Sequence, residues 1–158
     1  MITLALDAST RCTGWSVMDN GQYVDSGVID MNKDTETEHR IAEMTREICK
    51  IIHKYDPELV YLEDTVQMAN AKAYKSLCWL AGGIRYWCYR NDYPIEMIGP
   101  TVWRKHVQIQ ETRVKRAELK QRAMDLCRER FGLDDSEDRA EAILINLAMA
   151  IRNKIIEF

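Results

Sequence analysis

The sequence has few of the residues that signal a zinc site, a disulfide scaffold or a membrane segment. Its five cysteines are odd in number and widely spaced, and they include no C-x-x-C pair, so we expect reduced thiols. The three histidines are scattered, which suggests no Cys–His nucleophile. No apolar run approaches the length of a transmembrane helix, and the first residues lack the basic leader of a secretory signal. We therefore expect a cytoplasmic protein with no membrane contact.

The composition is that of an ordered protein. The 158 residues are 46% hydrophobic and 30% charged, which suits one domain spanning residues 1–158. The net charge of −3 does not by itself indicate a nucleic-acid binder. However, a basic stretch from Thr101 to Arg130 runs directly into an acidic one from Gly132 to Glu141. This order suits a metal site beside a phosphate track. On charge alone, a solvated helix followed by an acidic helix start is the better explanation.

The hydrophobic pattern predicts five strands and four helices. The Asn20-Gly21 pair predicts a tight hairpin turn between the second and third strands. The predicted strands are 2–6, 14–18, 23–29, 59–62 and 95–98, and the predicted helices are 41–55, 69–90, 114–131 and one that starts after Ser136. This order predicts an α/β fold with a mixed five-stranded sheet and helices on both faces.

Four carboxylates stand where they could form one site. Asp7 ends the first strand and Glu63 ends the fourth, so they would meet at one edge of the sheet if these strands are neighbours. Asp138 and Glu141 are three residues apart at the start of the last helix, which places both on one helical face. Carboxylate oxygens are the ligands that Mg²⁺ prefers. The four acids together therefore predict a magnesium site.

Each acid taken singly has an ordinary structural explanation. Asp7 can begin a turn, Glu63 can face solvent at a strand end, and Asp138 can offset the helix dipole. Asp135 also lies three residues from Asp138, so Asp135 and Asp138 are an alternative pair to Asp138 and Glu141. The alanines that flank Glu141 favour the latter.

Three segments resemble the RuvC family of Holliday junction resolvases. Leu4–Ser9 followed by Thr13-Gly14-Trp15 is similar to the first hairpin of that family, and Val60–Glu63 is similar to its second acidic strand. Asp138–Ala142 resembles its terminal Asp-x-Ala-Asp/Glu-Ala helix. The resemblance implies an RNase H-like fold, a homodimer, and two active sites that nick opposing strands of a four-way junction.

The resemblance also implies a mechanism and a DNA-contacting surface. Two Mg²⁺ ions about 4 Å apart would be bridged by Asp7, with Mn²⁺ as a substitute. The expected metal ligands are Asp7, Glu63, Asp138 and Glu141, with Lys115 neutralising charge on the phosphate. The expected DNA-binding residues are Arg104, Lys105, Lys115 and Arg116, each of which could equally be ordinary helix-surface charge.

One departure from the family pattern concerns junction recognition. Val66 stands where the bacterial resolvases have an aromatic residue three positions after the second acid. Tyr74 could replace it in stacking, or could simply pack on its helix.

Three other functions are considered. The first is a non-catalytic binder of branched DNA with the same fold, which the presence of all four acids disfavours. The second is a nuclease of this fold that prefers forks, flaps or RNA/DNA hybrids, which the sequence does not exclude. The third is an actin-like or sugar-kinase ATPase, which would need a second domain and further nucleotide-binding loops; the chain has no G-x-x-x-x-G-K-[ST] loop.

Overall fold

The computed structural model describes residues 1–31, 34–133 and 136–158, and it contains five strands and five helices in that part of the chain. The strands are β1 Ile2–Asp7, β2 Cys12–Asp19, β3 Gln22–Asp30, β4 Leu59–Glu63 and β5 Ile95–Ile98. The helices are α1 Thr37–Tyr55, α2 Ala71–Arg90, α3 Pro100–His106, α4 Arg116–Phe131 and α5 Glu137–Arg152. All five predicted strands are confirmed, with ends that differ by at most two residues.

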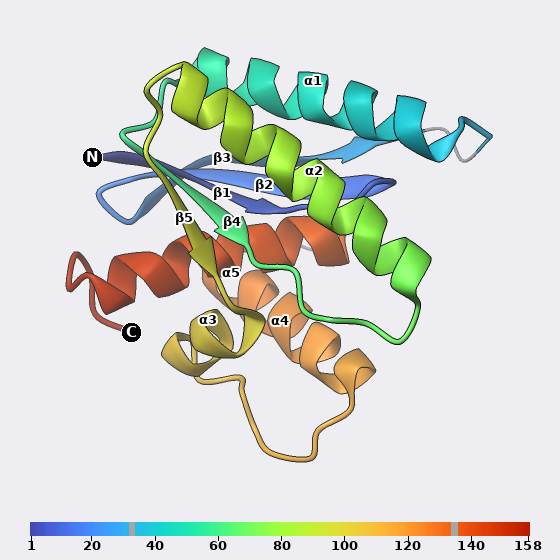
Figure 1. The fold of residues 1–158 in the computed structure, drawn as a ribbon. Coiled ribbons are helices and arrows are strands. Elements are labelled where there is room, and N and C mark those ends of the chain that lie inside the picture. The colour runs from blue at the N-terminus through green and yellow to red at the C-terminus, as the bar shows by residue number, and fades with distance from the viewer. Residues whose placement is uncertain (32–33, 134–135) are drawn as a thin grey trace.

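The sheet is mixed, with strand order β3-β2-β1-β4-β5. The first three strands are antiparallel to one another, whereas β1, β4 and β5 run parallel. Both Asn20 and Gly21 have positive φ at the β2–β3 turn, as the hairpin prediction requires. Helices α1 and α2 cover one face of the sheet, and α3, α4 and α5 lie on the other (Figure 1). The predicted α/β architecture is therefore confirmed.

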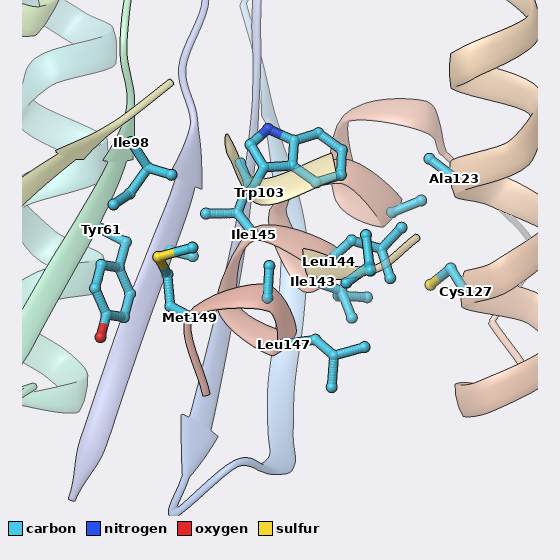
Figure 2. Packing of buried hydrophobic residues seen from close by; sticks show 14 of the residues in the cluster. Tyr61, Ile98, Trp103, Ala123, Cys127, Ile143, Leu144, Ile145, Leu147 and Met149 are labelled. Carbon is cyan, nitrogen blue, oxygen red and sulfur yellow. The ribbon is translucent and has the colours of Figure 1, made fainter. Parts of the chain in front are cut away.

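The central strand β1 is buried on both faces, because its side chains alternate between two cores. Leu4 and Leu6 pack in the core under α1 and α2, whereas Ala5 packs in the core around α5. In the second core, the fully buried Trp103 packs with side chains of α5 and the sheet (Figure 2). Such two-sided burial fixes β1 firmly, and with it the residue at its end.

Helix α5 docks closely on β1 and β2 through small and polar residues. The buried Asn146 accepts a hydrogen bond from the Thr3 hydroxyl at 2.6 Å and donates to the Ser16 carbonyl at 3.2 Å. Gly14 on β2 allows the start of α5 to approach, since a Cβ there would lie 1.8 Å from the Asp138 carbonyl oxygen. The start of α5 is thus held against the strand next to Asp7.

The sequence prediction missed one helix. Gly99-Pro100 ends β5 as predicted, but Pro100 also occupies the first turn of the seven-residue helix α3. This helix is too short for its apolar periodicity to stand out, and it is held by the burial of Trp103. None of the helices in the described ranges has the length and apolar character needed to cross a lipid bilayer.

Candidate active site

Parallel pairing of β1 with β4 brings Asp7 and Glu63 together. Leu6 is paired with Leu62, and Asp7 and Glu63 are the residues that follow at the same edge of the sheet. Both carboxylates are half-buried. The sequence prediction placed them at one edge on the condition that these strands are neighbours, and the sheet order meets that condition.

Helix α5 adds the other two carboxylates. Asp138 is half-buried in its first turn, and Glu141 lies one turn later and is only 4% exposed. Asp7, Glu63, Asp138 and Glu141 all line one cleft of about 410 Å³. The structure therefore gathers the four acids that the sequence singled out. The alternative residue Asp135 lies outside the described residues.

The pKa values of the strand-end acids report how crowded the carboxylates are. Burial raises the pKa of Asp7 well above its usual value, and the charges of Glu63, Glu141 and Asp138 raise it further. Burial and the Glu141 charge raise the pKa of Glu63 to about 7, although Arg104, Trp103 and Arg116 act in the opposite direction. The surroundings of Asp7 and Glu63 thus disfavour the charged forms of both carboxyl groups.

One cation lies inside this acidic cluster. Arg104 Nη2 on α3 donates to Glu141 Oε1 at 3.0 Å, and the two side chains are only 12% and 5% exposed. The guanidinium also lies 4.8 Å from the ring centre of Trp103. The sequence left Arg104 as either a DNA-binding residue or ordinary helix-surface charge. The structure places it in the wall of the cleft, paired with a carboxylate, and its contact with DNA stays a prediction.

Two further cations reach the cleft from α4. Arg116 and Lys120 are four residues apart, so they share one helical face, and both line the cavity. Lys120 also pairs with Glu137 at 2.6 Å. The sequence prediction included Arg116 but missed Lys120, although the spacing from Arg116 was the available signal. The predicted Lys115 and Lys105 are exposed and do not line this cavity.

The site has the donors that a divalent cation needs. The carboxylates are hard oxygen ligands, and Glu63 Oε2 is buried without a hydrogen-bond partner among the described residues. As the side chains stand, no three His, Cys, Asp or Glu residues of the described chain are already arranged as a metal cage. One carboxylate oxygen, Glu141 Oε1, is engaged by Arg104. The donor set therefore fits a metal, and Arg104 competes with it for that oxygen.

The loop after β4 forms the remaining wall of the cleft. Val66 and Met68 line it, and Val66 is 58% exposed. The residue that replaces the expected aromatic is thus at the surface, where an apolar contact with DNA is sterically open. Tyr74 is half-buried on α2 and does not line the cleft, so its stacking role stays a prediction.

Sequence comparison finds similarity to one enzyme family. A family model for the crossover junction endodeoxyribonuclease RuvC matches residues 3–124. The RuvC protein of Fusobacterium nucleatum subsp. nucleatum is 30% identical over 152 residues, which cover 92% of this chain and 77% of that protein. The RuvC protein of Rickettsia akari is 28% identical over 111 residues, which cover 68% of this chain and 71% of that protein.

Structural comparison finds the same fold. The Thermus thermophilus RuvC in complex with Holliday junction substrate superposes with a TM-score of 0.77 at 14% identity, covering 98% of this chain and 96% of that one. The Fowlpox virus resolvase, in complex with Holliday junction DNA, superposes with a TM-score of 0.68 at 14% identity, covering 97% of this chain and 99% of that one. At this identity the likeness establishes the fold.

Proposed function

The chain belongs to the RuvC family of crossover junction endodeoxyribonucleases, and from this premise we propose that its catalytic metal site is the cluster of four carboxylates in the cleft. The protein is a Holliday junction resolving endonuclease, that is, a hydrolase of DNA phosphodiester bonds. The observation that carries the site assignment is the convergence of Asp7, Glu63, Asp138 and Glu141 on one cavity.

Nucleases of this family are metal-dependent, and we propose that this site takes two Mg²⁺ ions, for which Mn²⁺ can substitute. The carboxylates of Asp7, Glu63, Asp138 and Glu141 would hold the metals. When bound, the metals supply an activated water and offset the charge that develops on the phosphate. The unpartnered Glu63 Oε2 and the mutual repulsion of the carboxylates support this proposal, since both are relieved by a divalent cation.

The chain's own cations then orient and neutralise the DNA phosphates. Arg116 and Lys120 project from α4 into the cleft, where they can meet the phosphate that faces the carboxylates. Lys115, at the exposed start of α4, is one residue from Arg116 and is proposed to act on the same strand. Lys105 would contact a flanking phosphate from the exposed side of α3. Arg104 holds Glu141, and it would be available to a phosphate if that carboxylate were bound to metal instead.

The substrate is branched DNA, bound mainly through its phosphates. Binding is therefore expected to be salt-dependent and to follow the shape of a four-way junction rather than base edges. We propose that the protein acts as a homodimer, so that two clefts nick opposing strands. A cytoplasmic location is part of the same proposal.

The decisive experiment replaces the acid at the end of β1. Asp7→Asn keeps the size of the side chain and removes its charge, so we expect nicking of a labelled junction in Mg²⁺ to fall by at least 1000-fold while binding is retained. The matched control is Asp19→Asn. Asp19 ends β2 at the edge of the sheet opposite to the cleft, so this variant should nick as the unchanged protein does. Melting temperatures of both variants check folding.

A substrate panel separates the remaining alternatives. The unchanged protein is given labelled four-way junctions, forks, flaps and RNA/DNA hybrids at one Mg²⁺ concentration, and junctions should be cut fastest. Full nicking by Asp7→Asn would rule out the assigned site. Binding without nicking by the unchanged protein would leave only a non-catalytic binder of branched DNA.

A further inference from the structure

A second cavity adjoins the carboxylate cleft, and its chemistry is the opposite. It has a volume of about 440 Å³ and shares Ser9 and Leu77 with the cleft. Of the residues that the structure describes, three cations line it, Arg11, Arg40 and Lys72, and no carboxylate does. The remaining walls are mainly hydroxyl and amide side chains. This basic pocket lies where the β1–β2 turn meets the starts of α1 and α2.

The cations of the basic pocket are available to a ligand. Arg11 and Lys72 are exposed, and no salt bridge to either is found among the described residues. Arg40 is only 6% exposed, and its Nε is buried without a hydrogen-bond partner in the described chain. Its Nη1 donates to the Thr35 carbonyl at 2.7 Å, which holds the guanidinium in place. A guanidinium that lines a cavity and is held in place is suited to binding an oxyanion.

The turn that joins the two cavities is stiff. Ser9 Oγ donates to the Cys12 carbonyl at 2.6 Å and accepts from the Cys12 amide at 3.1 Å, and Thr13 Oγ1 donates to the Ser9 carbonyl at 2.9 Å. Asp7 in the cleft and Arg11 in the basic pocket are therefore held at a fixed separation. The Cα atoms of Asp7 and Arg11, four residues apart, are separated by at most about 14 Å. Measured along the axis of B-form DNA, this length corresponds to about four nucleotides of one strand, at 3.4 Å each.

We propose that the basic pocket binds a phosphodiester of the DNA strand that is being cut, within about four nucleotides of the scissile phosphate. This proposal rests on the proposed function of the adjoining cleft. The physical reason is that the carboxylates, when ionised and free of metal, repel the DNA backbone, so cations are needed beside the cleft. Arg116 and Lys120 supply them on the α4 side, and the basic pocket supplies them on the α1–α2 side (Figure 1).

The test measures junction binding in EDTA as a function of salt, with Asp7→Asn as the background. Adding Arg11→Ala and Lys72→Ala together should weaken binding at least 10-fold and reduce the log–log salt slope by about 1.8, which corresponds to two phosphate contacts. The matched control removes two exposed cations, Lys54 and Arg90, at the other ends of the same two helices. Lys54→Ala with Arg90→Ala should leave affinity and slope unchanged.

Uncharged methylphosphonate linkages then locate the contact. Placed singly along the cut strand, they should weaken binding at one or two positions within about four nucleotides of the cut, and those positions should lose their effect in the Arg11/Lys72 double variant. Unchanged affinity and slope in the double variant, or equal sensitivity of both proteins at every position, would overturn the pocket assignment. Persistent nicking by Asp7→Asn would instead overturn the cleft assignment, so the two failures are distinguishable.

Discussion

At the scale of single residues, the site is governed by how tightly it packs like charges. Asp7 and Glu63 end adjacent parallel strands, and Glu141 faces them from a buried position on α5. Burial, and after it the neighbouring carboxylates, favour the protonated forms and raise the pKa values of Asp7 and Glu63. A site of this kind binds protons when metal is absent and must release them when metal binds. Proton and metal therefore compete for the same oxygens.

This competition predicts an unusual pH dependence for the metal-free protein. The pKa of Glu63 is raised from 4.5 to about 7 in the folded state, so between these values the folded protein holds more protons than the unfolded chain. The contribution of Glu63 to stability is therefore fully present below about pH 4.5 and is lost as the pH rises through about 7. The raised pKa of Asp7 acts in the same direction. Denaturant unfolding in EDTA from pH 4 to 8 measures this pH dependence of the free energy of unfolding.

A matched pair of variants isolates this contribution. Glu63→Gln should remove part of the loss of stability between pH 4.5 and 7, whereas Glu58→Gln, at the exposed start region of the same strand, should not. Saturating Mg²⁺ should stabilise the unchanged protein more at pH 8 than at pH 5. Equal pH profiles for Glu63→Gln and the unchanged protein would contradict the prediction.

At the scale of elements, the position of α5 against the sheet sets the positions of two of the four carboxylates of the cleft. Asp138 and Glu141 reach the cleft because the first turn of α5 approaches β2 at a residue without a side chain, Gly14. Farther along, Asn146 ties the helix to both β1 and β2. The close approach therefore follows from two small local features of the contact.

Gly14→Ala should disturb both stability and chemistry. The new Cβ would overlap the Asp138 carbonyl, which is backbone and cannot turn aside, so α5 must shift. We expect a loss of about 3 kcal/mol or more in the free energy of unfolding, at the upper end of what overpacking costs. Nicking of junction DNA should fall at least 10-fold even at temperatures where the variant is folded.

The control for this variant is Gly99→Ala at the start of α3. Its Cβ would meet only Val102 at 3.7 Å, which is an ordinary contact. We expect a loss of less than about 1 kcal/mol, because alanine is a poorer helix-cap residue than glycine. Urea unfolding of both variants measures the difference. Equal stability of the two variants would show that α5 adjusts freely at Gly14.

At the scale of the whole molecule, one helix face is left uncovered by the described residues. Helix α2 buries Leu80, Ile84 and Cys88 beneath it, so it is not buried on both sides. Its other face exposes Trp79, Tyr86 and Tyr89, of which Tyr86 is 68% exposed. Large exposed aromatics in one row favour an interface. We propose this face as the contact between the two copies of the dimer.

Charge introduced on this face should separate the dimer. Tyr86→Glu with Tyr89→Glu should give a monomer by light scattering at micromolar concentration, because two buried carboxylates on each copy would face their symmetry mates. The matched control, Val24→Glu with Val28→Glu, places the same charges on the exposed edge strand β3. It should remain a dimer. If the valine variant were a monomer and the tyrosine variant a dimer, the interface would lie at β3 instead.

The sequence by itself determined every strand, every helix except α3, and the four acids of the cleft. Local patterns carry this information, since alternation fixes which side chains of a strand are buried and the Asn20-Gly21 pair fixes a turn. The end of an apolar strand can be recognised in the sequence, so Asp7 and Glu63 could be singled out before their neighbours in the fold were known. The same holds for Asp138 and Glu141, whose spacing places them on one helical face.

Only the tertiary structure decided which charges meet. Arg104 looked like surface charge because its partner, Glu141, is 37 residues away, and Lys120 was missed because its neighbours lie on another helix. The basic pocket is likewise assembled from three segments, around Arg11, Arg40 and Lys72. Electrostatic environment depends on distances through space, whereas sequence patterns report only the burial and local geometry of each element. The gathering of the four carboxylates was therefore predictable, whereas the pairing of Arg104 with Glu141 and the position of Lys120 in the cleft were not.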